Sequence, residues 1–576
     1  MKQTRVSLLA RRVVAASMLM SLALCFLPAM GQGVTEPADP KPGTQKAWDA
    51  VTKPSFVWGS TDVRYDQMQL YPLKAASTPM LHAWRGERVS AQTLFSLYGV
   101  NRDLEISLSV SDLKSGKNVI PADCIRRYFV RYVLADGYGK HGKDSCLVAD
   151  RLDPQPTCRV EANNNCPVWL DIRVPQDATP GKYSGTVSVS YEGTTLSLPI
   201  KLTVGKRVLP EPKDWKFHLD LWQNPYAVAR YFDVPLWSKE HFDRMRPIME
   251  MYAEAGGKVI TTSIIQHPWN SQTEDPFESM IVKMKGIDGR WTYDYTVFDR
   301  WVEFMMSCGV TEQIDCYSIV LWGYRFEYID MATSTLKTIA CKPGEKAYEE
   351  YLLPFLTDFA RHLKAKGWFD KTCIAMDERP MDQMRIAWDI ARRADPGYRI
   401  EGAVNYSPEV VSMMYDISLA YQHVNIPAEV AAQRRADGLR TTFYTCCSPD
   451  HPNTFTFSPP AESAFIGLHA AALGFDGYLR WAFNSWVKDP CTDSRFRTWY
   501  SGDCFLVYPT GSSIRFERLV QGIQDFEKIR ILRAEATPAQ QKKLDAILAP
   551  FAGNTYADDT DAAALVRKAE EQLNKF

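Results

Sequence analysis

The sequence predicts a (β/α)8 barrel, with an antiparallel β-sandwich before it and flanking helices after it. Three observations indicate this α/β architecture. The 576 residues exceed one typical domain. Short β-branched runs separated by Gly and Pro fill the region 56–208, as in a sandwich. Strand-like and helix-like segments then alternate over about 270 residues, the length of a barrel. We therefore expect the sandwich at 56–208, the barrel at 213–510 and C-terminal helices at 511–576.

Within the sandwich region, alternating apolar residues predict strands at 104–110, 168–174, 186–191 and 196–204. This region offers no nucleophile and no convergent pair of acids, so we interpret it as an accessory domain. Four clustered cysteines are its candidates for disulfide pairing: Cys124, Cys146, Cys158 and Cys166.

Eight strands are predicted for the barrel, at 215–222, 258–265, 314–321, 372–376, 400–404, 417–421, 441–444 and 477–481. Apolar positions at helical spacing predict helices at 237–255, 298–308, 348–366, 381–394, 427–437 and 461–473. Amphipathic segments at 516–534 and 538–576 predict helices packed against the barrel.

The first residues are typical of an export signal. A basic leader precedes the apolar run Val13–Leu27, and small residues follow at the spacing of a cleavage site. We expect a signal peptide at 1–31, a flexible lead-in at 32–55, and a periplasmic or extracellular protein. Lipid attachment at Cys25 is disfavoured, because Leu24 stands where a small residue is wanted. No other segment reaches the ~20 apolar residues of a membrane span.

The net charge, the cysteine spacing and the aromatic content limit the classes of partner and cofactor that we expect. A net charge of -1 supplies no long-range field, which argues against nucleic acid and anionic membranes. The cysteines show no paired C-x-x-C knuckles, so we expect no zinc framework. His267 and Asp220 are the alternative as metal ligands, but their spacing gives no positive signal, and we expect neither a metal nor a cofactor. Aromatic residues make up 12% of the chain and suit sugar rings, which favours a glycan or glycolipid substrate. The oligomeric state is not indicated.

The most informative segment is the strand 372–376, which ends in the adjacent carboxylates Asp377 and Glu378. The C-terminal end of a barrel strand faces the active site. One carboxyl with a raised pKa can donate a proton while its neighbour stays ionised, which is the chemistry of glycosidic cleavage. The alternative is a solvated acidic pair that opens a loop, with a salt bridge to Arg379.

Further candidate binding residues lie at the ends of the other strands, where stacking rings and hydrogen-bonding groups predominate. They are Trp222, His267, Tyr317, Asn405, Tyr406, Tyr444, Arg480, Trp481, Asn484 and Trp486, with Trp269 and Trp322 at the same strand ends. For the tryptophans the alternative is buried packing. For Arg480 it is an ion pair with a core acid, and for His267 a structural role.

The seventh predicted strand offers no carboxylate where many retaining barrel glycosidases place their nucleophile. The 2-acetamido group of an N-acetylhexosamine can take that role by attacking its own anomeric carbon. Glu378 would then be the acid and base, and Asp377 would orient the acetamido N–H. Tyr444 or Tyr406 would hydrogen-bond the acetamido oxygen.

Three segments resemble glycoside hydrolase family 123, the β-N-acetylgalactosaminidases. They are the strand around Asp220, the sequence Met376–Pro380, and the last-strand segment Gly477–Trp486. The helix Ile514–Glu527 is also similar to the family. The resemblance covers about 215–533 and implies catalysis by Asp377 and Glu378 with substrate assistance.

The sequence therefore predicts an exported, exo-acting, retaining glycosidase that releases terminal β-linked N-acetylgalactosamine. Two alternatives stay open. One is a β-hexosaminidase or another glycosidase of different sugar preference, and the other is a barrel that binds carbohydrate without catalysis.

Overall fold

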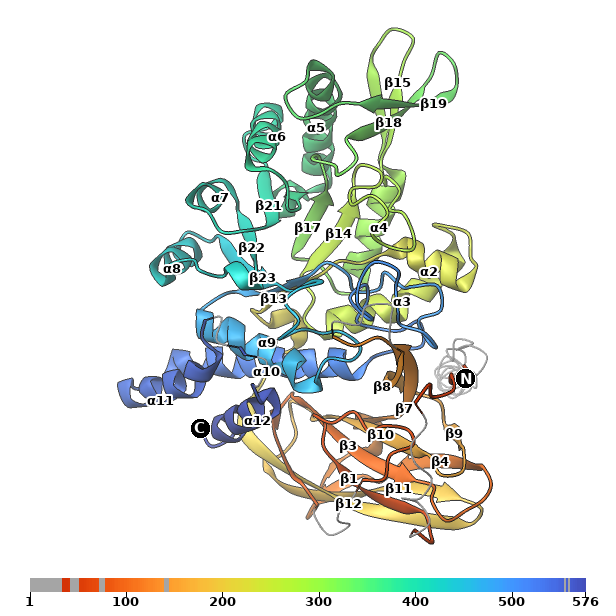
Figure 1. Cartoon of the computed structure of the whole chain (residues 1–576). Helices are drawn as coiled ribbons and strands as arrows, with labels where there is room; N and C mark the ends of the chain where they lie inside the picture. Colours follow the sequence, from red (N-terminus) through yellow and green to blue (C-terminus); the bar gives the residue numbers. More distant parts are fainter. Residues whose placement is uncertain (1–33, 42–50, 72–77, 139–144, 554–555, 558–559) are drawn as a thin grey trace, which may run out of the picture. The chain divides into compact units, whose positions relative to one another are not determined.

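The computed structural model describes residues 34–41, 51–71, 78–138, 145–553, 556–557 and 560–576 (Figure 1). The predicted signal peptide with Cys25, and residues 32–33 and 42–50 of the predicted lead-in, lie outside these described residues. Residues Glu36–Phe576 form one compact unit. In the part of the chain that the structure describes, no helix has the length and apolar character needed to cross a bilayer.

The N-terminal region is a sandwich of two sheets, as predicted. Apolar side chains from both sheets, among them Phe95, Ile106, Val168, Val187 and Ile200, form its core. One sheet has the strand order β1(Ser55–Gly59), β3(Arg88–Ser96), β10(Asn165–Arg173), β7(Ile125–Ala135), β8(Cys146–Asp153). The other has the order β2(Met80–Arg85), β12(Thr194–Val208), β11(Gly181–Tyr191), β4(Leu104–Val110), β9(Thr157–Val160), with β5(Leu113–Ser115) and β6(Asn118–Ile120) attached.

Pairing within the sandwich is antiparallel except between β2 and β12, which are parallel. Among the clustered cysteines, the sulfurs of Cys158 and Cys166 lie 3.9 Å apart as thiols.

Eight parallel strands form the barrel, all at the predicted places in the chain. Five agree with their predicted ranges to within one residue at each end, whereas the ranges predicted for the first three strands extend up to four residues too far. In chain order they are β13(His218–Leu221), β14(Val259–Ser263), β17(Gln313–Tyr317), β20(Thr372–Met376), β21(Arg399–Val404), β22(Asp416–Ala420), β23(Arg440–Tyr444) and β24(Gly477–Arg480). The main chain of Lys258 donates to Leu219 over 3.0 Å and brings β14 back to β13. At the other side of β13, a Cβ on Gly477 would lie 1.9 Å from the oxygen of His218, so only glycine fits there.

Helices follow the strands around the barrel (Figure 1). They are α2(Pro225–Phe232), α3(Lys239–Glu254), α4(Thr296–Ser307), α5(Lys346–Lys366), α6(Met381–Ala394), α7(Pro408–Met413), α8(Ala428–Ala436) and α9(Pro460–Leu473). Short 3-10 helices occur at Ala122–Cys124, Pro212–Asp214, Phe369–Lys371, Tyr421–His423 and Ala549–Phe551. The sequence analysis missed α2 and α7, which are too short to show a helical period. Both have Pro as the first helical residue, and Asn224 and Ser407 cap their N-termini.

The sequence analysis also missed a four-stranded sheet with the order β16-β15-β18-β19. β15(Val282–Lys285) and β16(Trp291–Asp294) lie between β14 and α4, and β18(Arg325–Asp330) and β19(Thr335–Ala340) lie between β17 and α5. Both insertions therefore start from the C-terminal ends of barrel strands.

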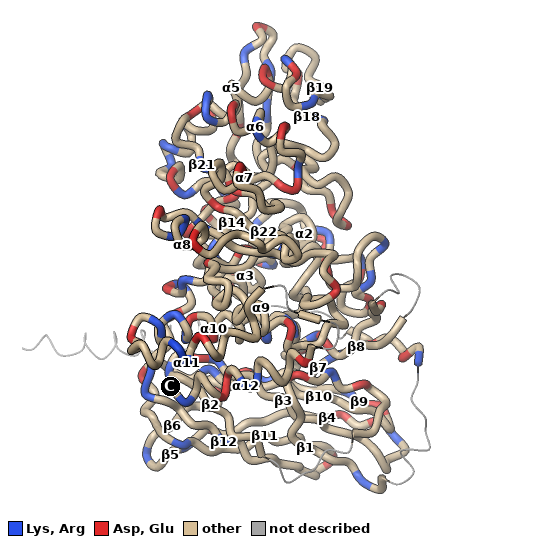
Figure 2. The backbone as a smooth tube through the Cα atoms, turned by 60° about the vertical axis from the view of Figure 1, so that its left-hand side comes forward, with Lys and Arg blue, Asp and Glu red and all other residues tan. Residues whose placement is uncertain are grey.

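The C-terminal helices are α10(Ile514–Glu535), α11(Pro538–Leu548) and α12(Ala562–Leu573), so the helical region predicted at 538–576 is divided in two. α10 joins the barrel to the sandwich: the buried Arg515 pairs with Asp150 at 3.0 Å, and Lys528 pairs with Glu87. Basic and acidic residues are interspersed along the chain (Figure 2), in keeping with the near-zero net charge.

Candidate active site

The acidic pair Asp377 and Glu378 directly follows β20, at the C-terminal end of the fourth barrel strand. Five buried residues of β20 fix where the pair begins, and the chain leaves the strand there towards α6. Asp377 is partly buried, whereas Glu378 is exposed. The predicted position of the pair at the active-site end of the barrel is therefore present in the structure.

Each carboxylate has its own hydrogen-bond donor. The indole Nε1–H of Trp322 donates to Asp377 Oδ2 over 2.6 Å, and the main-chain N–H of Glu378 donates to Asp377 Oδ1 over 2.7 Å. The hydroxyl of Tyr444, at the end of β23, donates to Glu378 Oε1. Arg379 packs over the Trp322 ring, 4.5 Å from its centroid, and none of the described ion pairs joins Arg379 to either acid. The alternative interpretation, a salt bridge from Arg379 to the acidic pair, is therefore absent among the residues that the structure describes.

Burial shapes the ionisation of this group. Desolvation raises the pKa of Asp377 to about 6, although the donors Trp322 and Glu378 N–H oppose the shift. Desolvation, followed by the charge of Glu378, raises the pKa of Tyr444, so this phenol stays protonated and remains a donor. Asp377 therefore changes charge near neutral pH while its neighbour is held by a fixed donor.

The pair opens into a cavity of about 150 Å³ whose walls are largely aromatic. Trp222 and Trp269 stack at one side, with ring centroids 4.8 Å apart and an interplanar angle of 25°. The wall is formed by Trp222, Trp269, Gln272, Trp322, Asp377, Glu378, Ala403, Tyr444, Cys446, Cys447, Leu479, Trp481, Trp499 and Asp503. Tryptophan faces beside two carboxylates suit the apolar face and the polar edge of a sugar.

A third acid, Asp503, lines the cavity, and its carboxylate is paired with other side chains of the protein. Its Oδ1 accepts from the Arg480 guanidinium at 2.7 Å and from Trp481 Nε1 at 3.1 Å. Asp503 and Arg480 are both fully buried. This ion pair fixes the Trp481 ring at the cavity wall.

Of the predicted binding residues, Trp222, Tyr444 and Trp481 line this cavity, as do Trp269 and Trp322, which were predicted at the same strand ends. Asn405 and Tyr406 line a neighbouring hollow of about 780 Å³ that also contacts Glu378. The exposed acid therefore lies between the aromatic cavity and this second hollow.

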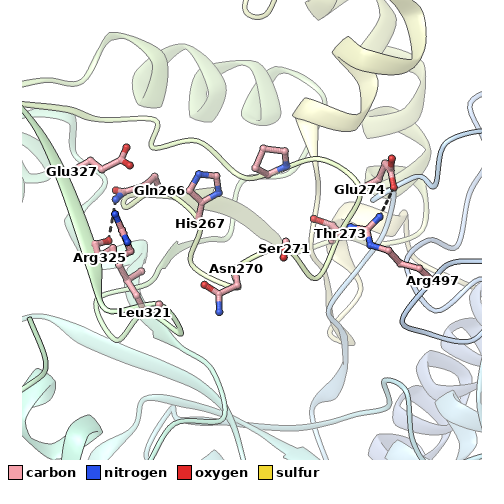
Figure 3. A pocket seen from close by; sticks show the side chains of 12 residues that line it. Gln266, His267, Asn270, Ser271, Thr273, Glu274, Leu321, Arg325, Glu327 and Arg497 are labelled. Atoms are coloured by element: carbon pink, nitrogen blue, oxygen red, sulfur yellow. Dashed lines mark hydrogen bonds and ion pairs between the residues drawn. The ribbon is translucent and has the colours of Figure 1, made fainter. Parts of the chain in front are cut away.

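His267 lies elsewhere, in a cavity of about 530 Å³ between the segment 266–276 and the first residues of β18 (Figure 3). Polar side chains line this cavity, including Gln266, Asn270, Arg325 and Glu327. Because Trp269 and Gln272 of the same segment line the aromatic cavity, the two cavities lie on either side of this segment. The predicted direct contact of His267 with the sugar at the catalytic pair is not supported by this position.

Four other predicted binding residues lie beneath the cavity rather than in its wall. Tyr317 is fully buried and donates to Glu401 over 3.0 Å, Asn484 donates to the main chain of Asn224, and Trp486 donates to the main chain of Val507. Arg480 makes the buried ion pair with Asp503 that its alternative interpretation anticipated. All four side chains are buried and hydrogen-bonded within the protein, and none is in the described wall of the aromatic cavity, so their contact with the sugar stays a prediction.

Several residues of the wall escaped the sequence analysis, namely Gln272, Trp499, Asp503, Cys446 and Cys447. Trp499 and Asp503 belong to the long segment between β24 and α10, far from any strand end. No periodicity marks such positions, so only the fold brings them to the cavity.

The barrel interior holds a separate acidic cluster. One carboxylate oxygen each from Asp220, Asp315 and Glu401 lies within 4.8 Å of the others, the spacing of a cation site. Desolvation raises the pKa of all three, since burial disfavours their charged forms.

A parallel barrel with an acidic pair at the end of its fourth strand, facing a tryptophan-lined cavity, defines a glycoside hydrolase. Comparison with known proteins specifies which one. The family model described as "Glycoside hydrolase 123, catalytic domain" matches residues 222–532, and "Glycoside hydrolase 123 N-terminal domain" matches residues 58–191. The chain belongs to glycoside hydrolase family 123.

Among solved structures, a family 123 glycoside hydrolase from Clostridium perfringens, studied for glycolipid glycan hydrolysis, has a TM-score of 0.83 and 26% identity. The match covers 91% of this chain and 97% of that protein. A termite-gut GH10 xylanase with an Ig-like domain reaches a TM-score of only 0.31 at 13% identity, covering 64% of this chain and 91% of its own. No curated protein matches the sequence.

Proposed function

We propose that this enzyme is an exo-acting, retaining glycosidase that releases terminal β-linked N-acetylgalactosamine from glycans by substrate-assisted catalysis. The observation that carries the proposal is the adjacent pair Asp377 and Glu378, each held by a separate donor in a cavity lined by tryptophan. The resemblance to the β-N-acetylgalactosaminidases supports the choice of sugar.

In the first step, Glu378 gives a proton to the glycosidic oxygen as its bond to the anomeric carbon breaks. The acetamido oxygen of the same sugar forms the new bond to that carbon and gives an oxazolinium ion. In the second step, Glu378 takes a proton from water, and the water oxygen opens the ring with overall retention. The Tyr444 hydroxyl orients Glu378 through both steps.

Asp377 acts as the anion that accepts the acetamido N–H and stabilises the positive charge of the oxazolinium ion. Its two hydrogen bonds, from Trp322 and from Glu378 N–H, hold the carboxylate in one orientation. Fixed donors of this kind remove the cost of reorienting the group during the reaction.

A protein nucleophile is the alternative to substrate assistance, and Asp503 is the other acid in the described cavity wall. A nucleophile needs an accessible oxygen next to the anomeric carbon. The Asp503 side chain is fully buried, with Oδ1 held by Arg480 and Trp481, and its Oδ2, although without a hydrogen-bond partner, is buried as well. The burial of Asp503 therefore favours the acetamido oxygen of the substrate as the nucleophile.

The choice of a glycolipid glycan as the larger substrate rests on the Clostridium perfringens relative, whose structure concerns glycolipid glycan hydrolysis. A cavity of about 150 Å³ is small, in keeping with removal of one terminal sugar at a time.

The test compares an aryl β-N-acetylgalactosaminide with the matching N-acetylglucosaminide and galactoside. We expect turnover of the first, strong inhibition by the thiazoline analogue of the cyclised intermediate, and a β-anomer as the first product in proton NMR. Preference for the N-acetylglucosaminide would indicate a β-hexosaminidase. Turnover of the galactoside, or rescue of Asp503→Asn by azide, would overturn substrate assistance. Sugar binding without any turnover would indicate a carbohydrate-binding barrel.

A further inference from the structure

The four-stranded sheet β16-β15-β18-β19 carries an unusual group of exposed apolar residues. Ile287, Leu336 and Met331 are 90%, 63% and 53% exposed, more than any other large apolar side chain in the described chain. Single exposed apolar residues are common, but apolar residues gathered at one place on a surface mark a contact site. We call these three residues the apolar tip.

The strand register brings the apolar tip together. β15 and β18 run parallel, with Lys285 opposite Asp330, and Met331 N–H donates to the oxygen of Lys285 over 3.0 Å. The turn after β15, which carries Ile287, therefore lies beside the turn after β18, which carries Met331. Leu336 opposes Ile329 at the start of β19, close to the same turn.

The base of this sheet is anchored, so the tip is presented on a fixed support. Phe326 is 1% exposed, and Tyr351 of α5 donates to the oxygen of Glu327 over 2.7 Å. Trp291 packs edge-to-face on the same Tyr351 ring. Figure 1 shows the sheet next to α5, with its turns directed away from the barrel strands.

The sheet stands on the catalytic side of the barrel, because both insertions follow the C-terminal ends of barrel strands. Arg325 and Glu327, at the start of β18, line the polar cavity that contains His267 (Figure 3). From Arg325 to Met331 the chain advances six residues, or about 20 Å at ~3.3 Å per residue. The apolar tip is therefore about 20 Å along β18 from this polar cavity.

We propose that the apolar tip inserts into the surface of a lipid bilayer and presents the catalytic cavity to the glycan of a glycolipid. This proposal rests on the proposed function, in which a glycolipid glycan is the substrate. Apolar side chains gain free energy at the lipid boundary. The charged residues beside the tip are mixed in sign, Lys285 and Lys337 with Asp288 and Asp330, which suits the phosphate and ammonium groups of a zwitterionic lipid surface. Contact through apolar side chains requires no net positive charge, which agrees with the near-neutral chain.

A second copy of the chain is the competing occupant, since β19 is an edge strand. The edge is poorly suited to strand pairing, because Thr335, Lys337 and Thr338 are exposed along it and an edge lysine blocks such pairing. Of the three apolar side chains only Leu336 lies on β19, at its start, and Ile287 and Met331 lie in turns.

The test measures co-sedimentation with phosphatidylcholine vesicles, with and without a glycolipid that ends in β-linked N-acetylgalactosamine. The tip variant combines Ile287→Ser, Met331→Ser and Leu336→Ser. The matched control combines Met80→Ser, Val119→Ser and Leu236→Ser, which replace apolar residues of 45–48% exposure elsewhere. None of these six residues lines the catalytic cavity, so all proteins should hydrolyse the soluble aryl substrate at equal rates.

We expect the tip variant to lose vesicle binding and turnover of vesicle-borne glycolipid by about tenfold or more, with the control near wild type. Equal vesicle binding by the two variants, or no vesicle binding by the wild type, would overturn the proposal. A dimer that the tip variant loses, with no vesicle binding, would assign the tip to a second copy instead. If the wild type binds vesicles through the tip but turns over no aryl substrate, the proposed function fails and the lipid contact stands.

Discussion

Replacing Trp322 by Phe tests how the protein sets the charge of Asp377. The indole Nε1–H donates to Asp377 Oδ2 over 2.6 Å, and desolvation raises the pKa of Asp377 to about 6. Phe keeps an aromatic ring at the cavity but removes the donor that stabilises the ionised carboxylate. The pKa of Asp377 should therefore rise further.

The magnitude follows from the value of the hydrogen bond. A hydrogen bond to a charged group contributes about 1.5–3 kcal/mol, and one pKa unit corresponds to about 1.4 kcal/mol, which gives about 1–2 units. Asp377 is partly accessible, and water replaces some of the lost bond, so we expect about 1 unit. Because the proposed mechanism uses ionised Asp377, activity falls as pH drops through this pKa, and the acid limb should move from near 6 to near 7.

The assay is the pH dependence of kcat/KM on an aryl β-N-acetylgalactosaminide. At pH 6 the variant should lose about fivefold relative to wild type, a loss that approaches tenfold below pH 5 and shrinks towards pH 8. Trp499→Phe is the matched control, since Trp499 lines the same cavity but donates to the oxygen of Gln272 instead of a carboxylate. An unmoved acid limb in Trp322→Phe, or an equal shift in Trp499→Phe, would refute the reasoning.

Further predictions concern the other groups of the site and a buried lysine. Glu378→Gln should lower kcat on natural linkages by about 10³-fold while calorimetry still detects substrate binding; near-normal turnover would exclude Glu378 as the acid. Tyr444→Phe removes the donor to Glu378 and should lower kcat/KM by about 10–100-fold with an unchanged melting temperature; a large loss of Tm would instead indicate a structural role. Asp503→Asn leaves the buried charge of Arg480 without its partner and should lower the free energy of unfolding in urea by about 3–5 kcal/mol; no loss would contradict a buried ion pair. Burial lowers the pKa of Lys283 to about 7, so between pH 7 and 10 the unfolded chain holds a proton that the folded protein has released. The wild type should therefore gain stability relative to Lys283→Met by about 3–5 kcal/mol over this range, and a flat difference in urea midpoints would show that Lys283 is charged when folded.

The barrel strands were predictable because each is short, buried and rich in apolar residues. β20 agrees with its predicted range at both ends, since five consecutive buried residues separate a helix from the acidic pair. The sheet containing β15 and β19 was missed, because its exposed strands bury little surface and show no regular alternation. Its position depends on packing against α5, which no local pattern records.

The residues of the candidate site also include some that were predictable from the sequence and some that were not. Asp377 and Glu378 were predictable because an abrupt change from apolar to charged residues at a strand end is a local signal. Arg480 and Trp486 share a strand end with Trp481, yet their side chains are buried whereas Trp481 lines the cavity. The end of a strand fixes only the main-chain position of a residue. The packing of neighbouring segments decides whether its side chain is buried or lines the cavity.

By itself, the sequence determined the order of the eight barrel strands, the family and the position of the acidic pair, because each depends on residues close together in the chain. Only the tertiary structure decided that Trp322 and Tyr444 hold the two carboxylates, that Asp503 pairs with Arg480, and that two turns place their apolar residues side by side. These features join residues that lie 23 to 66 positions apart, and such contacts exist only once the chain has folded.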